Sequence, residues 1–276
     1  MKKISYLLLL MIAAVLVLAA CGSKDKETNE DHETHNESGS AGDDLLSQVK
    51  ENGELLVGTE GTYAPFTFHD ESGKLTGFDV EIAEEIASRL GVEAKFMETQ
   101  WDAMFPGLDS KRFDMIANQV GIKPERQEKY DFSEPYISSS AVLVTQADNT
   151  DVKGFEDIKG LKAAQSLTSN YGKMAQSYGA EIVGVDGFIQ AIELLNSKRV
   201  DVTINDKLSV LDFQKQKPDA KIQIVAEADD AAQSGLMFRK ESETLVEAVN
   251  EALNEMIEDG TYDKISDKWF GENVLE

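Results

Sequence analysis

From about residue 44 onward, short apolar runs alternate with stretches of helical hydrophobic period. Leu55–Val57 has the composition of a short buried strand. Apolar residues recur every four positions over 78–90, and similar patterns occupy 188–195 and 245–256, each of which predicts an amphipathic helix. Strands that alternate with helices favour an α/β fold whose sheets are mostly parallel, with helices on both faces.

Several local expectations follow from the same part of the sequence. Ala64–Phe68 predicts a further strand, and the polar residues at 71–74 predict a turn after it. Asp79 has the chemistry of a helix N-cap for the helix that ends at Gly91. Strands are also expected at Ala94–Met97 and 113–117, on either side of a helix over 101–111.

A weak internal repeat relates two segments of the chain. Ser110–Asn118 and Ser197–Asn205 both begin Ser-Lys-Arg, both enter an apolar strand, and both end in asparagine. Each follows a predicted amphipathic helix. Ligands of open α/β sheets bind beyond the carboxyl ends of the strands, so the repeat predicts two lobes whose polar strand ends face one cleft. The alternative is a coincidence among basic residues at helix ends.

The only cysteine, Cys21, follows a basic start at Lys2 and Lys3 and an apolar run over 7–20. This arrangement is typical of a secretory signal, because the run is too short for an ordinary membrane span. We therefore expect a signal peptide at 1–20. The mature chain would have 276 − 20 = 256 residues, which favours two lobes over one core.

Leu18-Ala19-Ala20-Cys21 resembles the bacterial lipobox, in which the cysteine becomes the lipidated first residue of the mature chain. Two or more acyl chains, such as palmitate, are needed for a lasting anchor. Lipidation of Cys21 would leave no thiol for disulfides, metal ligation or catalysis. The polar segment 21–43 is expected to be a flexible tether. Its two histidines, His32 and His35, are interpreted as solvated linker residues, with a weak metal site as the alternative.

The formal charge of −24 arises from 51 acidic and 27 basic residues. Such a surface repels nucleic acid and anionic lipid headgroups, so we expect neither as a partner.

The segment Gly77-Phe78-Asp79-Val80-Glu81-Ile82-Ala83-Glu84-Glu85-Ile86-Ala87 resembles the signature of the polar-amino-acid family, family 3, of ABC-transporter solute-binding proteins. The resemblance continues through 57–60, 131–136 and 269–271. Within the family, 58–63, 99–101, 117–120 and 165–171 are most similar to the L-cystine binders.

Membership of this family implies a two-lobed, type II periplasmic-binding-protein-like fold whose lobes are joined by two crossover segments. By analogy, lobe 1 comprises 44–137 and 235–276, and lobe 2 comprises 138–234. Ser138–Ala141 and Ala232–Gly235 would be the hinges, and small residues dominate both.

The resemblance also implies a binding role for individual residues. Arg126 is expected to hold the ligand carboxylate, because a guanidinium offers a bidentate fork, and Asp206 is expected to pair with the ammonium. The remaining predicted ligand-binding residues are backbone donors, aromatic walls or extra polar groups: Glu60, Tyr63, Trp101, Asn118, Gln119, Gly121, Gln165, Thr168, Ser169 and Asn170. Asn205 is a further polar group of the expected cleft.

The implied function is the capture of a polar amino acid, L-cystine first, for a membrane permease and its ATPase subunits. The protein would be a monomer without cofactor or metal, held by its lipid at the outer face of the cytoplasmic membrane. An enzyme on the same scaffold, such as a cyclohexadienyl-dehydratase-like protein, is the main alternative. Only His69 and Glu60 would offer it acid–base chemistry, so no catalytic residue is assigned. A sensory ectodomain that docks on a receptor is the third interpretation, and it is disfavoured because no membrane segment follows the lobes.

Overall fold

The computed structural model describes residues 44–275. The predicted signal peptide, Cys21 and the tether histidines lie outside the described residues. None of the helices within 44–275 is long and apolar enough to cross a membrane.

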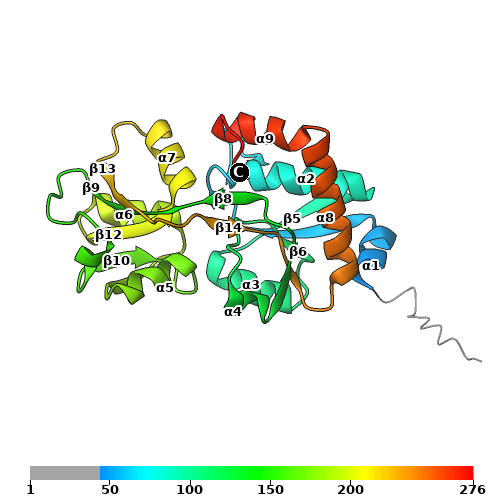
Figure 1. The fold of residues 1–276 in the computed structure, drawn as a ribbon, viewed down its shortest axis with the longest axis horizontal. Helices are drawn as coiled ribbons and strands as arrows, with labels where there is room; N and C mark the ends of the chain where they lie inside the picture. The colour runs from blue at the N-terminus through cyan, green and yellow to red at the C-terminus, as the bar shows by residue number, and fades with distance from the viewer. Residues whose placement is uncertain (1–43, 276) are drawn as a thin grey trace, which may run out of the picture. The chain divides into compact units, whose positions relative to one another are not determined.

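Two five-stranded sheets form the framework (Figure 1). The first has the order β5-β1-β6-β15-β7, and its strands are β1 (Glu54–Thr59), β5 (Glu93–Glu98), β6 (Met115–Ile116), β7 (Tyr130–Phe132) and β15 (Met237–Arg239). Its helices are α1 (Leu45–Asn52), α2 (Phe78–Leu90), α3 (Trp101–Asp109), α4 (Pro124–Gln127), α8 (Glu243–Glu258) and α9 (Thr261–Phe270). A small sheet of β2 (Thr62–Tyr63), β3 (Thr67–His69) and β4 (Leu75–Thr76) completes this part, which we call lobe 1.

The second sheet has the order β11-β10-β12-β9-β13 and forms the centre of lobe 2. Its strands are β9 (Ala141–Gln146), β10 (Lys162–Gln165), β11 (Glu181–Gly184), β12 (Val202–Asp206) and β13 (Ile222–Glu227). Around it lie the 3₁₀ helix η1 (Phe155–Ile158) and the helices α5 (Asn170–Ser177), α6 (Phe188–Asn196) and α7 (Lys207–Gln216). The predicted two-lobed α/β fold is thus confirmed.

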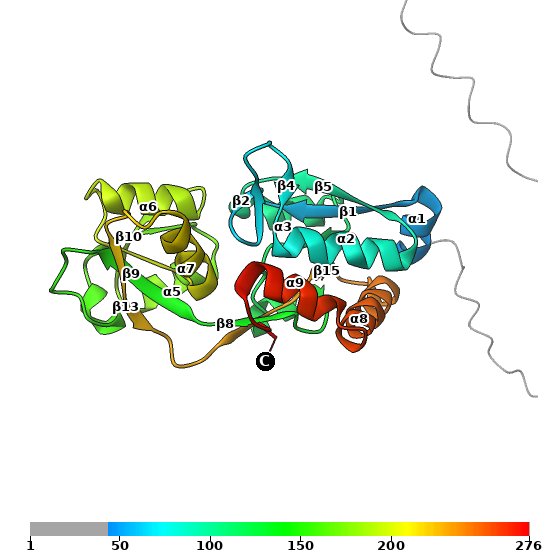
Figure 2. The same ribbon diagram turned by 90° about the horizontal axis from the view of Figure 1, so that it is seen from above.

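Two short strands run side by side between the sheets (Figure 1). These are β8 (Ile137–Ser139) and β14 (Ala232–Ser234), which pair antiparallel with Ala232 opposite Ser139. Figure 2 shows one of them, β8, from above. Both strands lie at the positions where the chain passes from one sheet to the other. The exact lobe boundaries and the hinge role of these segments stay predictions.

The expectation of mostly parallel sheets is confirmed, with one antiparallel strand in each sheet. In lobe 1, β1 pairs parallel with β5 and β6, but β15 is antiparallel to β6 and β7. Lobe 2 repeats this pattern, because β9 is antiparallel to β12 and β13. The reason is the crossover: β9 and β15 enter their sheets from the crossover strands and therefore run away from the edge at which β6 and β12 end.

Two local expectations were wrong. The stretch 64–68 is not one strand, because the chain turns between β2 and β3, where Phe66 N donates to Tyr63 O at 3.0 Å. Helix α2 is preceded by Gly77 rather than capped by Asp79, and Gly77 has φ 132°. A Cβ atom there would lie 2.2 Å from Phe66 O, so glycine is required, and Asp79 becomes a buried residue of the first turn.

The internal repeat has a structural counterpart. After α3 and α6, Lys111 and Lys198 adopt the left-handed conformation, with φ of 60° and 58°. Asp114 and Asp201, each three residues further on, accept hydrogen bonds from the backbone N–H of Leu56 and Lys162, respectively. The two lobes therefore deliver β6 and β12 to their sheets through the same turn.

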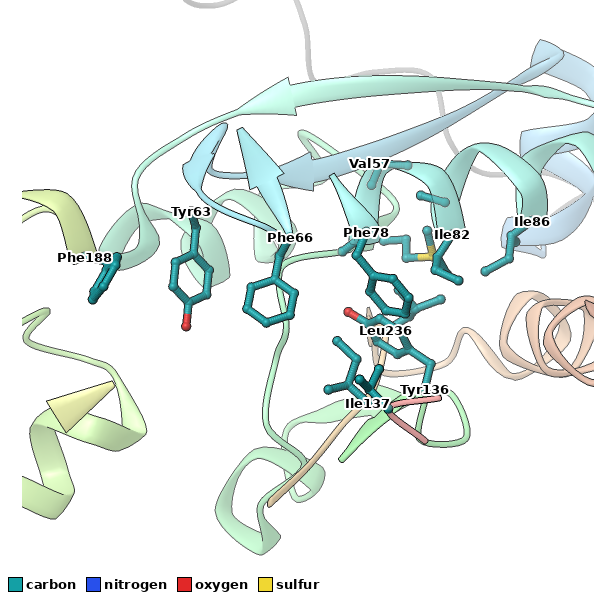
Figure 3. Close-up of a cluster of buried hydrophobic side chains, with 14 of the residues drawn as sticks. Val57, Tyr63, Phe66, Phe78, Ile82, Ile86, Tyr136, Ile137, Phe188 and Leu236 are labelled. Atoms are coloured by element: carbon teal, nitrogen blue, oxygen red, sulfur yellow. The ribbon is translucent and has the colours of Figure 1, made fainter. Parts of the chain in front are cut away.

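Aromatic and aliphatic side chains fill the centre of lobe 1 (Figure 3). The rings of Phe78 and Tyr136 are stacked, with centroids 6.1 Å apart and planes at 9°. Ile82 and Ile86 continue the buried face of α2. This core holds the start of α2 against Tyr136, the residue immediately before β8.

Candidate ligand-binding site

A cavity lies between the two lobes at the carboxyl ends of β1, β6, β10 and β12. Its volume is about 50 Å³. Lobe 1 contributes Glu60, Tyr63, Trp101, Asn118 and Gln119 to its wall. Lobe 2 contributes Ala164, Gln165, Ser166, Ser169, Asn170, Tyr171, Val185, Gly187, Phe188, Ala191, Thr203 and Asn205. Strand ends of both sheets thus face one cavity, as the repeat predicts.

Most of the predicted binding residues line this cavity, but Gly121, Arg126, Thr168 and Asp206 do not. Arg126 and Asp206 are buried directly behind the wall, and Thr168 lies at the rim. The structure therefore brings the predicted set together in one region, with the two charged residues one layer deeper than the polar ones.

Arg126 is only 6% exposed. Its Nη1 donates to Gly121 O at 2.8 Å, and its guanidinium lies 5.4 Å from the ring centroid of Trp101. Residues 44–275 provide no acidic side chain in ion-pair contact with it. Burial lowers the pKa of Arg126. A buried guanidinium without a carboxylate is an unbalanced charge, because buried charges are normally paired.

Asp206 is 1% exposed and carries the opposite charge. It accepts hydrogen bonds from Gln119 Nε2 at 2.6 Å, from Tyr171 Oη at 3.4 Å and from Leu208 N at 2.8 Å. These donors are neutral, and within the described chain no lysine or arginine forms an ion pair with Asp206. Burial raises the pKa of Asp206, and the hydrogen bond from Gln119 opposes this shift.

Tyr171 connects the two charges. It lines the cavity from the first turn of α5. Burial and then the charge of Asp206 raise the pKa of Tyr171, and the charge of Arg126 opposes this rise. Its neighbour Asn170 faces Gly121 across the cleft, because a Cβ atom on Gly121 would lie 3.6 Å from Arg126 Nη1 and 4.0 Å from Asn170 Nδ2. Donors from both lobes therefore converge beside Gly121.

Thr168 contacts the other lobe rather than the cavity. Its N–H and its hydroxyl donate to Asp102 Oδ1 at 3.0 and 2.6 Å. Further contacts across the cleft join Tyr63 Oη to Asn205 Oδ1 at 2.8 Å, and Lys173 to Glu125 at 3.2 Å. The two walls of the cleft are thus in direct contact.

Glu60 is the acidic group of the cavity wall. Asn118 Nδ2 donates to its Oε2 at 2.6 Å, and Asn118 Oδ1 accepts from its backbone N–H at 2.8 Å. Burial raises the pKa of Glu60 to about 7, although the hydrogen bond from Asn118 opposes the shift. The carboxyl group therefore changes its charge in the neutral pH range.

The aromatic part of the wall contains two residues that the sequence interpretation did not assign to the site, Tyr171 and Phe188. Phe188 lies at the start of α6, with its ring 6.4 Å from that of Tyr63. The repeat contained the signal: Phe188 precedes Ser197 by 197 − 188 = 9 positions, and Trp101 precedes Ser110 by 110 − 101 = 9. Both aromatic residues begin the helix that leads into the repeated turn.

His69, by contrast, lies away from the cavity wall. Its Nε2 is 3.2 Å from Glu98 Oε1, and its Nδ1 is 3.1 Å from Gly61 O. Among the described residues there is no cluster of three or more histidine, cysteine, aspartate or glutamate side chains suited to a metal ion. The chemistry that the wall offers is hydrogen bonding and charge pairing.

The family model described as bacterial extracellular solute-binding proteins, family 3, matches residues 55–272. The chain belongs to this family. The chain is similar to the L-cystine-binding protein TcyA of Bacillus subtilis, with 49% identity over 275 residues that cover 99% of each chain. The class is one of binding proteins rather than enzymes, in agreement with the expectation from the sequence, and it places the protein outside the cytoplasm.

Two solved structures of solute-binding proteins place the cleft in context. An ancestral arginine-binding protein bound to arginine is 40% identical, with a TM-score of 0.75 and coverage of 79% of this chain and 98% of that one. The L-cystine solute receptor of Neisseria gonorrhoeae in the unliganded open conformation is 49% identical, yet its TM-score is 0.55, with coverage of 83% and 98%. The lower similarity at higher identity indicates a different lobe arrangement, and the direct contacts across the cleft identify the present state as closed.

The raised pKa of Glu60 predicts how stability depends on pH. Between about pH 4.5 and 7, the folded ligand-free protein keeps a proton that the unfolded chain releases, so the free energy of unfolding decreases as the pH rises through this interval. One pKa unit corresponds to about 1.4 kcal/mol, so the rise from 4.5 to about 7 makes Glu60 contribute on the order of 3–4 kcal/mol to this decrease. Glu60→Gln should flatten the profile measured by chemical denaturation.

Asp79 and Asp206 have raised pKa values with the same sign, so part of the slope should remain in Glu60→Gln. Glu71→Gln, on an exposed turn, is the matched control and should leave the profile unchanged. An identical slope in Glu60→Gln and wild type would contradict the assignment.

Proposed function

We propose that this protein is the solute-binding component of an amino-acid ABC importer and that it captures L-cystine between its lobes for delivery to a membrane permease and its ATPase subunits. The binding of L-cystine by a relative that is 49% identical over almost the whole chain supports the choice of ligand. The cleft supplies the physical argument.

The observation that carries the proposal is the pair of buried charges, Arg126 and Asp206, each without an oppositely charged partner in the described chain. Leaving either charge unpaired in a closed cleft is costly. An α-amino acid carries one carboxylate and one ammonium, so a single ligand satisfies both residues at once. A purely anionic or purely cationic ligand would satisfy only one.

In this arrangement the ligand carboxylate binds beside Gly121, where the guanidinium of Arg126 and the amide of Asn170 converge. A guanidinium suits this task because it donates two parallel hydrogen bonds. The indole Nε1 of Trp101 is buried without a hydrogen-bond partner among residues 44–275, and it is a further donor available to a polar ligand. The ammonium pairs with Asp206, which Gln119 and Tyr171 orient.

Cystine is distinguished from smaller amino acids by its second zwitterionic end. The wall offers additional polar groups for that end, namely Glu60, Asn118, Gln165 and Asn205. Tyr63, Trp101 and Phe188 supply the apolar surface that would cover the disulfide and its methylene groups. A small aliphatic amino acid would have no second polar end for these groups to bind.

Entry of such a ligand requires the lobes to separate. The cavity of about 50 Å³ is room for only a few water molecules, at roughly 10–15 Å³ each. We propose that the segments 138–141 and 232–235 act as hinges, and that the contacts of Asp102 with Thr168 and of Glu125 with Lys173 break on opening. The protein would act as a monomer that binds one ligand.

Cys21 lies outside the described residues, and its lipidation is proposed from the sequence alone. The apolar run before it, the small residues Ala19 and Ala20, and the polar segment after it support a lipid anchor at the outer face of the cytoplasmic membrane. The anchor would keep a strongly acidic protein beside its permease.

Removal of either buried charge should weaken ligand binding. Arg126→Ala and Asp206→Ala are each expected to reduce the affinity for L-cystine by roughly 2–5 kcal/mol, because each leaves one buried ligand charge unpaired. Arg126→Lys should also bind weakly, since the bidentate geometry is lost. Isothermal titration calorimetry measures the effect.

The controls are Arg112→Ala, at an exposed arginine, and Asp201→Asn. Asp201 directly precedes the start of β12, whereas Asp206 is the last residue of that strand. Both should bind with the wild-type affinity. Near-native affinity in the alanine variants of Arg126 or Asp206 would mean that the ligand lies elsewhere.

The identity of the ligand is tested by titrating L-cystine under oxidising conditions and L-cysteine under reducing conditions, with glutamine and arginine for comparison. We expect L-cystine to bind at least 100-fold more tightly than L-cysteine, because a site built for polar groups rejects a ligand that lacks them by a large factor, about 10⁴ in favourable cases. Equal affinities, or a clear preference for glutamine, would overturn the ligand assignment and leave the amino-acid role standing.

The anchor is tested by Cys21→Ser in the native host. This variant should leave the membrane fraction and appear in the medium or the soluble extracytoplasmic fraction, while its affinity for L-cystine stays at the wild-type value. A Cys21→Ser protein that remains in the membrane fraction would refute lipidation at this residue.

A further inference from the structure

Asp79 is a fully buried carboxyl group outside the cavity wall. It is 0% exposed and lies in the first turn of α2. Its Oδ2 accepts a hydrogen bond from the backbone N–H of Gln119 at 2.6 Å, and its Oδ1 is buried without a hydrogen-bond partner in the described chain. Burying a carboxyl group is costly. Asp79 does not cap α2, because the N-cap residue is Gly77, so its burial needs another explanation.

Gln119, the partner of Asp79, has an uncommon backbone conformation. Its φ is 48°, in the left-handed region that residues other than glycine seldom adopt. In this conformation its side chain points into the cleft, where Nε2 donates to Asp206 at 2.6 Å and Oε1 accepts from Tyr63 Oη at 3.3 Å. The conformation of one residue thus sets a contact between the lobes.

The same residue is attached to the second crossover strand, β14. Gln119 O accepts a hydrogen bond from Ser234 Oγ of β14 at 3.3 Å. On the other side, Tyr136, immediately before β8, lies close to Asp79, and its hydroxyl is buried without a hydrogen-bond partner among residues 44–275. Burial raises the pKa of Tyr136, and the charge of Asp79 raises it further. Figure 3 shows Tyr136 against Phe78, the neighbour of Asp79. Asp79 therefore lies between the first crossover strand and the cleft residue.

We propose that Asp79 is a positioning residue for ligand binding: its carboxyl group holds the backbone of Gln119 in the left-handed conformation, and Gln119 in turn presents its side-chain amide to Asp206. The proposal rests on the proposed function, because the affected quantity is the affinity for an amino acid. Asp79 does not touch the ligand. It acts through Gln119. Because Asp79 also lies close to Tyr136, the residue that directly precedes β8, it is located beside the crossover segment.

The alternatives differ in what substitution of Asp79 does. If Asp79 serves only stability, its replacement lowers the melting temperature and leaves the affinity of the folded fraction unchanged. If it positions Gln119, the affinity falls, and the loss disappears once the Gln119 side chain has been removed. A double-mutant cycle separates the two cases.

The variants are Asp79→Leu, Asp79→Asn, Gln119→Ala and the double variant Asp79→Leu/Gln119→Ala. Asp79→Leu removes the acceptor, keeps the branched shape of the side chain and should weaken L-cystine binding by about 10-fold or more. Asp79→Asn keeps an acceptor oxygen and should stay within about 3-fold of wild type. The double variant should bind as Gln119→Ala does. Equal losses from Asp79→Leu in both backgrounds would overturn the proposal, as would wild-type affinity in Asp79→Leu.

Asp114→Leu is the matched control, because Asp114 also accepts a backbone N–H in lobe 1, from Leu56 at 3.2 Å, but lies away from the cleft. It is expected to change stability only. If Asp79→Leu does not fold, Asp79→Ala takes its place in the cycle.

Hydrogen exchange of the Gln119 amide, measured by NMR on the ligand-free protein, tests the positioning without a ligand. Protection should be lost in Asp79→Leu or Asp79→Ala and kept in Asp79→Asn. Unchanged protection in the folded leucine or alanine variant would overturn the proposal. Failure of the wild-type protein to bind L-cystine would instead refute the proposed ligand and leave this measurement decisive for Asp79.

Discussion

A charge withdrawn from water must be paired, and the cleft of this protein contains two charges that the described chain does not pair. Arg126 has a backbone carbonyl and aromatic rings around it, and Asp206 has only neutral donors. The side chains around the two charges shield or orient them. Trp101 and Phe105 keep water from the guanidinium, while Tyr171 and Gln119 orient the carboxylate. The proposed function follows from the ligand that would pair both charges, which is a molecule with one carboxylate for Arg126 and one ammonium for Asp206.

The fold forms the cleft around these charges from a segment that is repeated in both lobes. A helix, a left-handed lysine and a strand recur in both lobes and deliver Asn118 and Asn205 to facing edges. Strands β9 and β15, which follow the crossover strands, enter each sheet antiparallel and leave the carboxyl ends of β6 and β12 free to form the cleft. Because β8 and β14 are short and paired only with each other, few backbone positions separate the two lobes. Asp79 and Gln119 extend this connection into the site.

The sequence predicted what depends on local periodicity. Helix α2 ends at Leu90 before a left-handed Gly91, as the spacing of Ile82 and Ile86 indicated. It did not predict features that depend on contacts distant in sequence. Asp79 resembled an N-cap because its partner, Gln119, is forty residues away. Phe188 resembled a core residue of an amphipathic helix, and only its match to Trp101 in the repeat distinguished it. Arg126 and Asp206 were named by family resemblance, since neither periodicity nor spacing reveals that a charge will be buried.

The most direct test of the account uses two analogues of L-cystine that each lack one kind of charge. Cystamine keeps both ammonium groups and has no carboxylate, whereas 3,3′-dithiodipropionic acid keeps both carboxylates and has no ammonium. The two compounds retain the disulfide and therefore most of the apolar contact. Calorimetric titration of wild-type protein should give affinities at least about 100-fold below that of L-cystine for both, because each leaves Arg126 or Asp206 unpaired at a cost of about 3–5 kcal/mol. Binding of either analogue as tightly as L-cystine would contradict the central claim that the cleft is built to pair both charges of one zwitterion.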